Sequence, residues 1–357
     1  PRLIKGGWQL AGGHGTVDRT EAIADMMAFA ESGITAFDCA DIYTGVEELI
    51  GEFLCSWRER YGAAAPTMRV HTKCVPDRDA LPTLTRAELE RLIDRSLTRL
   101  GVDTLDLVQF HWWNFDVPGW LEAAGHLAEL KRSGKIRQLG VTNFDTSRLR
   151  MLLDAGIPIV SHQVQCSLLD RRALGAMATL CAERGVGLLT YGALAGGFFH
   201  ERWLGAREPI EPLENRSLVK YKLIIDEFGG WTAFQQLLRT MRGIADAHDS
   251  TIGAVALRAV LNEAAVTSVI VGARHADHLP ATLASLSLEF SASERAALQA
   301  VVEAIHRIRD NATTVSAAVE EQSGVAKTIA GSVRDAANRV QAVDSNGAAG
   351  PRLLEFR

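Results

Sequence analysis

Four side chains of different acid–base types recur where short apolar runs of the chain end. Asp38, Lys73 and His111 each stand at the end of such a run, and Tyr43 follows Asp38 by five residues. A tyrosine phenol has a reference pKa of about 10, so it is a poor proton donor at neutral pH without help from its surroundings. We predict that Lys73 lowers the pKa of Tyr43 and that Asp38 keeps the ammonium ionised and aimed.

His111 would complete this set by donating a hydrogen bond that orients a carbonyl oxygen. A tuned phenol acid, with no cluster of metal ligands and no activated serine or cysteine, suits carbonyl protonation coupled to hydride transfer. Taken singly, each residue has a structural alternative: Asp38 and Lys73 as a buried salt bridge, His111 as a core histidine. Their shared place at strand ends favours the functional interpretation.

The apolar runs that carry these residues predict eight parallel strands. They are continuous in Val, Ile and Leu, as in strands buried on both faces. The strands are expected at residues 3–8, 35–38, 69–74, 105–111, 137–141, 159–164, 187–191 and 268–272. Because they alternate with helical patterns, we predict an α/β protein with a (β/α)8 TIM barrel. A doubly wound fold is disfavoured because no G-x-G-x-x-G follows a strand.

The helical segments between the strands have recognisable ends. In residues 85–101, Thr85 and Glu88 have the spacing of a capping box, and the closing glycine can adopt the left-handed stop. Residues 46–61 and 120–134 each carry one apolar stripe. Reactive residues of a parallel barrel lie at the carboxyl ends of its strands, so we expect the four residues at one mouth.

Two segments break the alternation. Residues 192–230 are too long for a plain strand-to-helix connection, and they form either a functional excursion over the mouth or an ordinary surface insertion. Apolar residues in steps of four and three between Ile308 and Val340 predict a long appended helix at 304–343. Residues 344–357 are rich in Gly and Ala and are predicted to be disordered. The barrel would then comprise residues 1–303.

Composition narrows the classes of function and partner. A net charge of −5 argues against nucleic-acid binding, and no apolar run reaches the length of a membrane span. Residues 1–30 lack the order of a secretion signal. The five cysteines are widely spaced and form no C-x-x-C pair, which fits a reducing compartment without structural zinc. We therefore expect a cytoplasmic protein with no metal.

Five strings resemble the aldo-keto reductase superfamily in order and spacing, over about residues 2–302. They are F-D-C-A-D-I-Y at 37–43, H-T-K-C at 71–74, Q-F-H-W at 109–112, G-V-T-N-F at 140–144 and V-I-V-G-A-R at 269–274. The resemblance implies a barrel enzyme that binds a nicotinamide cofactor, normally NADP(H), in extended form. It implies Tyr43 as general acid/base, Lys73 and Asp38 as its tuning pair, and His111 as the residue that orients the carbonyl.

The resemblance also implies how the cofactor is held. Thr142, Asn143 and Gln163 fall where the family holds the nicotinamide carboxamide. Tyr191 falls where a ring stacks on the nicotinamide, and Arg274 matches a contact to the adenosine 2′-phosphate. The cofactor residues predicted in this way are Thr142, Asn143, Gln163, Tyr191, Gly192, Leu194, Gly272, Ala273, Arg274 and His278.

At the adenine end the chain departs from the family. The family has a glutamine or arginine and then a Glu-Asn pair where this chain has residues 278–282, H-L-P-A-T. We therefore expect NADP(H) as the preferred cofactor, with NAD(H) as the alternative. The pocket for a small carbonyl or alcohol substrate is predicted to be lined by Trp8, Trp112 and Trp113. Trp8 and Trp112 have the alternative of filling the core.

The heptad segment carries a second similarity. V-S-A-A-V-E-E-Q-S at 315–323 and I-A-G-S-V at 329–333 are similar to part of the cytoplasmic signalling hairpin of methyl-accepting chemotaxis receptors. Such hairpins assemble into helical bundles, so self-association through this helix is one expectation, and an appended helix that packs on the barrel is the other. The corresponding alternative function is a cofactor-binding redox sensor that signals through the helix. The presence of Tyr43 favours turnover, since a pure sensor would not need it.

Overall fold

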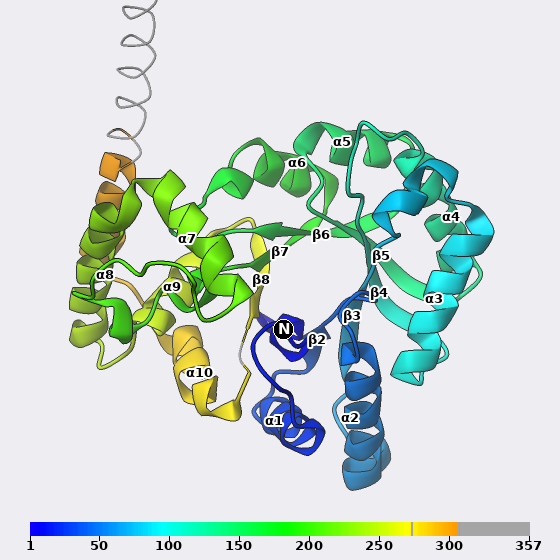
Figure 1. The fold of residues 1–357 in the computed structure, drawn as a ribbon, viewed down its shortest axis with the longest axis horizontal. Helices are drawn as coiled ribbons and strands as arrows, with labels where there is room; N and C mark the ends of the chain where they lie inside the picture. Colours follow the sequence, from blue (N-terminus) through cyan, green and yellow to red (C-terminus); the bar gives the residue numbers. More distant parts are fainter. Residues whose placement is uncertain (273, 306, 308–357) are drawn as a thin grey trace, which may run out of the picture. The chain divides into compact units, whose positions relative to one another are not determined.

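Eight parallel strands close into a barrel in the computed structural model, which describes residues 1–272, 274–305 and 307. The strands are β1 (Leu3–Gly6), β2 (Ala36–Asp38), β3 (Arg69–Cys74), β4 (Leu105–Phe110), β5 (Ile136–Thr142), β6 (Ile159–Gln165), β7 (Gly187–Tyr191) and β8 (Val266–Val271). Each pairs with the next strand in the sequence, and β8 pairs with β1 to close the ring. Figure 1 looks into this ring, with strands inside and helices outside. The prediction of a TIM barrel is confirmed.

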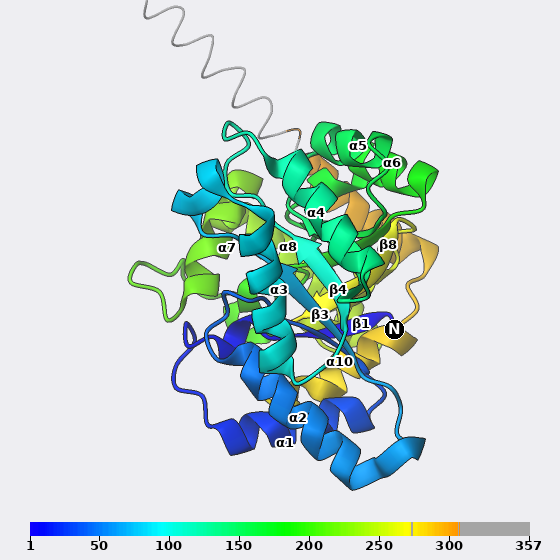
Figure 2. The same cartoon turned by 90° about the vertical axis from the view of Figure 1, so that its right-hand side faces the viewer.

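The outer layer consists of the helices that connect the strands. They are α1 (Arg19–Glu31), α2 (Val46–Tyr61), α3 (Arg86–Leu100), α4 (Trp120–Arg132), α5 (Thr146–Asp154), α6 (Ala176–Arg184), α7 (Arg216–Phe228), α8 (Gly230–Ala247), α9 (Ile252–Leu261) and α10 (Leu279–Ser287). In the side view of Figure 2, α2, α3 and α4 lie outside β3 and β4. Among these helices, none of the described ones is long and apolar enough to cross a membrane.

The predicted capping box begins α3. Thr85 Oγ1 accepts a hydrogen bond from the backbone N of Glu88 at 3.3 Å, and Glu88 Oε2 accepts one from the backbone N of Thr85 at 2.7 Å. Gly101 ends the helix in the left-handed region, with φ 62°. Local sequence therefore determines both ends of α3.

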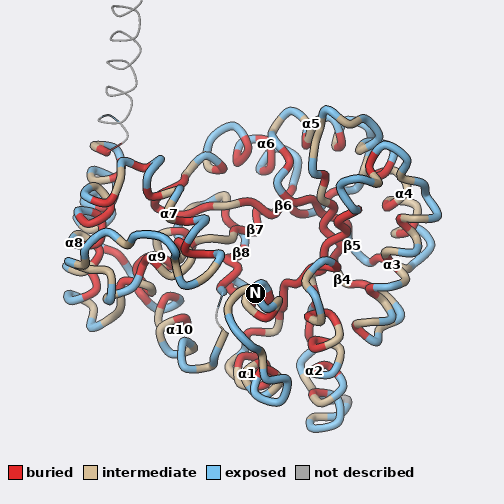
Figure 3. The backbone as a smooth tube through the Cα atoms, in the orientation of Figure 1, coloured by how far each residue is buried: buried red, intermediate tan, exposed pale blue. Residues whose placement is uncertain are grey.

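An apolar layer fills the lumen below the site. Ile4, Leu107, Leu189 and Ile270 pack together across the barrel, and each is at most 8% exposed. Side chains alternate along a strand, so Gln109 points to the same side as Leu107 but nearer to the carboxyl end of β4. Figure 3 shows the strands as the most deeply buried part of the chain. Polar side chains can thus gather only at the end of the lumen.

The segment 192–230 contains a helix of its own. Short turns of 3-10 helix at Ala195–Gly197 and Glu201–Trp203 lead to α7, which begins at Arg216. Residues 1–302 group by their contacts into one unit. Nearly all of the predicted helix at 304–343 and the whole of the tail at 344–357 lie outside the described residues. These two expectations, and the similarity to chemotaxis receptors, stay predictions.

Two glycines inside helices make a matched test of how closely α2 approaches α3. A Cβ on Gly51 of α2 would lie 2.6 Å from the backbone oxygen of Arg99, whereas a Cβ on Gly125 of α4 would have nothing within 4 Å. Gly51→Ala should lower the free energy of unfolding by about 1–3 kcal/mol, because backbone must shift to make room. Gly125→Ala should raise it by about 0.5–1 kcal/mol through helix propensity. Urea denaturation of both variants measures the difference, and equal effects would contradict the close approach.

Candidate active site

A buried salt bridge joins the carboxyl ends of β2 and β3. Lys73 Nζ lies 2.6 Å from Asp38 Oδ2 and donates a second hydrogen bond to the backbone oxygen of Cys39 at 2.7 Å. Asp38 and Lys73 are 4% and 6% exposed. Burial alone would lower the pKa of Lys73, but the charge and hydrogen bond of Asp38 raise it overall. The ammonium is therefore charged at neutral pH.

Two glutamines satisfy the other oxygen of Asp38. Gln109 Nε2 and Gln163 Nε2 donate to Asp38 Oδ1 at 3.0 and 2.6 Å, and Gln163 Nε2 also donates to Gln109 Oε1 at 3.0 Å. We expected Gln163 to contact cofactor, and both of its amide N–H groups are used within the protein. Gln109 was missed; its signal is a polar residue inside an apolar strand, two positions before His111 and so on the same face.

Tyr43 lies beside this pair on the connection between β2 and α2. Lys73 Nζ is 5.2 Å from the centre of its ring, and the ring of Trp8 packs edge-on at 5.1 Å. Burial raises the pKa of Tyr43 above its usual value and Asp38 adds to the rise, while Lys73 lowers it. The predicted effect of Lys73 has the right sign, but the expectation of a lowered pKa is wrong because the loss of hydration outweighs the cation. The phenol is therefore protonated at neutral pH.

His111 follows β4 directly and faces the same mouth. Its Nδ1 lies 3.4 Å from the backbone oxygen of Thr142, and the ring of Trp113 packs edge-on against it at 4.7 Å. Burial lowers the pKa of His111. The contact with Thr142 opposes this change, and the charge of Lys73 adds to it. A carbonyl oxygen can only accept, so this contact assigns the proton of the neutral ring to Nδ1. Nε2 is then an acceptor, in contrast to the donor that we predicted.

The predicted nicotinamide contacts meet at the ends of β5 and β7. Tyr191 Oη donates to Asn143 Oδ1 at 2.9 Å, and Asn143 has a left-handed backbone with φ 57°. Lys220 Nζ of α7 lies 4.7 Å from the ring centre of Tyr191 and 5.2 Å from that of Tyr221. A Cβ on Gly192 would collide with the Tyr221 hydroxyl, so α7 packs directly on the segment after β7. Part of the segment 192–230 thus borders the mouth.

Arg274 ties the segment after β8 to the segment after β1. Its guanidinium donates to the backbone oxygens of His14 and Thr16. His14 in turn reaches α7, with Nε2 and Ser217 Oγ 2.8 Å apart. Sequence reasoning missed this contact, since nothing in the sequence pairs residues so far apart.

The remaining predicted cofactor residues make fewer contacts with the other residues of the candidate site. Gly272 lies directly against the Gln9 side chain amide, which would have to move to admit a Cβ there. Leu194 packs at the edge of the core. His278 is exposed in a short turn before α10, and within residues 274–305 no contact joins its side chain to the others. Ala273 lies outside the described residues.

The three tryptophans divide between the mouth and the core. Trp8 and Trp113 are 37% and 46% exposed and pack against Tyr43 and His111. Trp112 is only 2% exposed and donates its Nε1 to a backbone oxygen at 3.1 Å. The structure thus does not support Trp112 as a pocket residue, because its ring points into the core.

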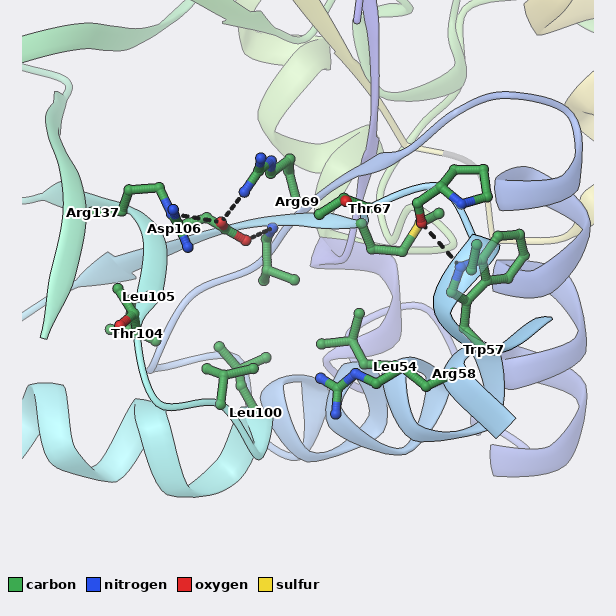
Figure 4. A pocket seen from close by; sticks show the side chains of 16 residues that line it. Leu54, Trp57, Arg58, Thr67, Arg69, Leu100, Thr104, Leu105, Asp106 and Arg137 are labelled. Atoms are coloured by element: carbon green, nitrogen blue, oxygen red, sulfur yellow. Dashed lines mark hydrogen bonds and ion pairs between the residues drawn. The ribbon is translucent and has the colours of Figure 1, made fainter. Parts of the chain in front are cut away.

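A separate cavity of about 320 Å³ lies at the opposite end of the barrel (Figure 4). It is bordered by the starts of β3 and β4 and by α2. Asp106 lines this cavity and forms salt bridges with Arg69 at 2.8 Å and with Arg137 at 3.4 Å. Since the residues described above gather at the carboxyl ends of the strands, this cavity is not part of the candidate site.

The salt bridge between Lys73 and Asp38 can be tested as a buried pair. Lys73→Met leaves the Asp38 carboxylate buried without its cation, and it should cost about 3–5 kcal/mol of unfolding free energy. The double variant with Asp38→Asn should cost less than the sum of the single variants, because no uncompensated charge stays behind. Urea denaturation measures this coupling. Arg19→Met, which breaks an exposed pair with Glu52, is the control and should cost at most about 1 kcal/mol.

Comparison with known proteins gives a consistent result. The model of the aldo/keto reductase family matches residues 2–303. The NADH-specific methylglyoxal reductase of Escherichia coli K12 is 26% identical over 336 residues, which are 86% of this chain and 96% of that protein. The flagellar radial spoke protein 5 of Chlamydomonas reinhardtii is 29% identical over 61% of this chain, but the match spans only 48% of that longer protein.

A solved structure shares the fold. The crystal structure of a thermostable aldo-keto reductase in complex with the inhibitor epalrestat has a TM-score of 0.64 and 26% sequence identity, over 84% of this chain and 95% of that one. Sequence and fold agree over the part of the chain that carries the buried salt bridge. The chain therefore belongs to the aldo/keto reductase family, a family of nicotinamide-dependent carbonyl oxidoreductases.

Proposed function

We propose that this chain reduces a small aldehyde or ketone to an alcohol, or oxidises the alcohol, with NADP(H) as the preferred cofactor. The observation that carries this proposal is the buried ammonium of Lys73 beside the phenol of Tyr43, 5.2 Å from its ring centre at the open end of the barrel. When bound, the cofactor supplies or accepts the hydride at the carbonyl carbon. The residues of the chain have to transfer the proton and orient the substrate.

Tyr43 is the group that moves the proton. Burial keeps its phenol protonated at neutral pH, so it can donate to the carbonyl oxygen. Lys73, held charged by Asp38, stabilises the phenolate that remains. With its Nδ1 proton directed at Thr142, His111 offers Nε2 as an acceptor that orients the hydroxyl of an alcohol. This leaves Tyr43 as the proton donor among these four residues.

At the mouth, in the part of the chain that the structure describes, lie cationic side chains without a salt bridge and buried polar atoms without a hydrogen-bond partner, as a site for a nicotinamide dinucleotide requires. Arg216 and Arg274 form no salt bridge with any carboxylate of the described residues. Within the same residues, Gln9 Oε1 and His14 Nδ1 are buried without a hydrogen-bond partner. Guanidinium groups favour phosphate, so we assign the phosphates to this side of the mouth.

The nicotinamide is assigned to the other side of the mouth. The ring of Tyr191 would stack on it, and Thr142 and Asn143 would hold its carboxamide. Gln163 uses its N–H groups on Asp38 and a neighbouring glutamine, which leaves Oε1 to accept from the carboxamide. Arg274 supports NADP(H), while the stretch at 278–282 and the NADH-specific relative keep NAD(H) as the competing outcome.

Tyr43→Phe tests the proton donor. Without the hydroxyl, turnover should fall by at least about 100-fold, the usual contribution of a general acid, while cofactor binding stays unchanged. The assay follows NADPH oxidation with a panel of aldehydes, and fluorescence titration measures NADPH binding. Tyr61→Phe, far along α2 at the surface, is the matched control and should leave turnover unchanged. Full activity of Tyr43→Phe would exclude this mechanism.

Arg274→Ala tests the cofactor preference. A lost charge-assisted contact to the 2′-phosphate should weaken NADPH binding by about 10- to 100-fold and leave NADH binding nearly unchanged. Arg274 also binds two backbone oxygens, so melting temperature is measured in parallel. Equal weakening of both cofactors, or tighter binding of NADH by the wild type, would contradict the NADP(H) preference.

A further inference from the structure

A second group of buried charges lies behind the site, and the proposed reaction does not use it. Asp41 and Glu47 are 4% and 1% exposed. Arg95 approaches Asp41 Oδ2 at 3.5 Å, and Arg99 approaches Glu47 Oε2 at 3.4 Å. The two arginines are four residues apart and therefore lie on one face of α3. This face is the one that α2 approaches closely at Gly51.

Asp41 anchors one end of the segment that carries Tyr43. Its Oδ2 accepts a hydrogen bond from the backbone N of Val75 at 3.3 Å. Its own backbone N donates to the backbone oxygen of Lys73 at 3.4 Å, and its backbone oxygen accepts from Arg99 at 2.9 Å. These contacts fix the backbone two residues before the phenol.

Glu47 anchors the other end of the segment, at the second residue of α2. Its Oε1 accepts a hydrogen bond from Thr72 Oγ1 at 2.7 Å. Thr72 precedes Lys73 in β3, so both ends of the segment are attached to the strand that carries the ammonium. The separation of Tyr43 and Lys73 therefore depends on Asp41 and Glu47, which take no direct part in the transfer of the proton or the hydride.

Asp41 is the weaker of the two anchors. Its Oδ1 is buried and has no hydrogen-bond partner among the described residues, and the side chain of Arg95 is 43% exposed. Burial raises the pKa of Asp41 to about 7; the N–H of Val75 opposes the rise, the charge of Glu47 adds to it and Arg95 opposes it. Near neutral pH this carboxyl therefore exists in both charge states.

The surroundings of Asp41 contain other charged and titratable groups. Glu47 and Glu48 of α2 both pair with Arg99. At the end of β3, burial raises the pKa of the Cys74 thiol well above its normal value, so the thiol stays neutral. Lys73 stays cationic through its own carboxylate partner. Arg95 is thus the cation that forms a salt bridge with the carboxylate of Asp41.

We propose that Asp41 is a positioning residue: with its carboxyl neutral it holds Tyr43 at its place beside Lys73, and ionisation, which leaves a charged buried oxygen without a hydrogen-bond partner among the described residues, relaxes this hold. The inference rests on the proposed role of Tyr43 as proton donor. Turnover should therefore fall as the pH rises through neutrality. The affinity for cofactor should stay constant, since Asp41 lies behind the mouth and contacts none of the groups assigned to the cofactor.

The experiment measures kcat and cofactor binding from about pH 5 to 9 in four proteins. Wild type should lose turnover toward high pH with a midpoint near 7, by up to about 100-fold, the effect that a misplacement of about 1 Å can have. Asp41→Asn cannot ionise, so it should keep the turnover that wild type has at low pH and lack this limb. Arg95→Met should move the midpoint upward, because it removes a charge that lowers the pKa of Asp41. Arg91→Ala, on an exposed face of α3, is the control and should match wild type.

Thermal unfolding gives a readout that needs no turnover. The folded pKa of Asp41 lies above its unfolded value of 3.8, so the ionisation of Asp41 removes stability as the pH rises from about 4 to 7. The melting temperature of wild type should therefore fall relative to that of Asp41→Asn over this range. If the asparagine variant does not fold, Arg95→Met still tests the midpoint.

Three outcomes overturn the inference. They are a high-pH limb that persists in Asp41→Asn, a midpoint that Arg91→Ala moves as far as Arg95→Met does, and a melting-temperature difference that does not change with pH. A wild type that turns over no carbonyl at any pH would instead overturn the proposed function, and the melting series would still show whether Asp41 titrates near neutrality.

Discussion

The salt bridge between Lys73 and Asp38 is the constraint on which the mouth of this barrel depends. A buried ammonium is strongly unfavourable unless a carboxylate compensates it and hydrogen bonds satisfy the remaining atoms. Here β2 and β3 supply the ions, while β4 and β6 supply the two glutamine amides that bind Asp38 Oδ1. Only a closed barrel brings the ends of these four strands to one point. The polar end of the lumen therefore rests on the fold as a whole.

The phenol depends on this pair without being bonded rigidly to it. Tyr43 sits on a connection outside the strands, and its place beside Lys73 is maintained by Asp41 and Glu47. Arginines of α3 neutralise these carboxylates, so the outer helical layer takes part in the geometry of the site. The close approach of α2 and α3 at Gly51 accompanies the placement of these arginines beside Asp41 and Glu47.

Much of the fold could be predicted from local patterns. The continuous apolar runs predicted eight strands that the structure shows within one or two residues at most ends, and the capping box predicted the start of α3. Asp38, Lys73 and His111 stood out because each ends a strand. Gln109 and Asp41 were missed as members of this environment, because their importance comes from contacts with residues far away in the sequence. Trp112 was misplaced because sequence position alone does not say on which side of a strand end a ring points.

The sequence by itself determined which residues stand at the strand ends and which family the chain resembles, since both follow from residue types in a linear order. The tertiary structure alone decided how those residues behave. The pKa of Tyr43 is raised, because burial outweighs the cation beside it, and His111 offers Nε2 as an acceptor, because its Nδ1–H is directed at a carbonyl oxygen far away in the sequence. Hydration and hydrogen bonding are set by everything that surrounds a group, and these surroundings come from segments that only folding brings together.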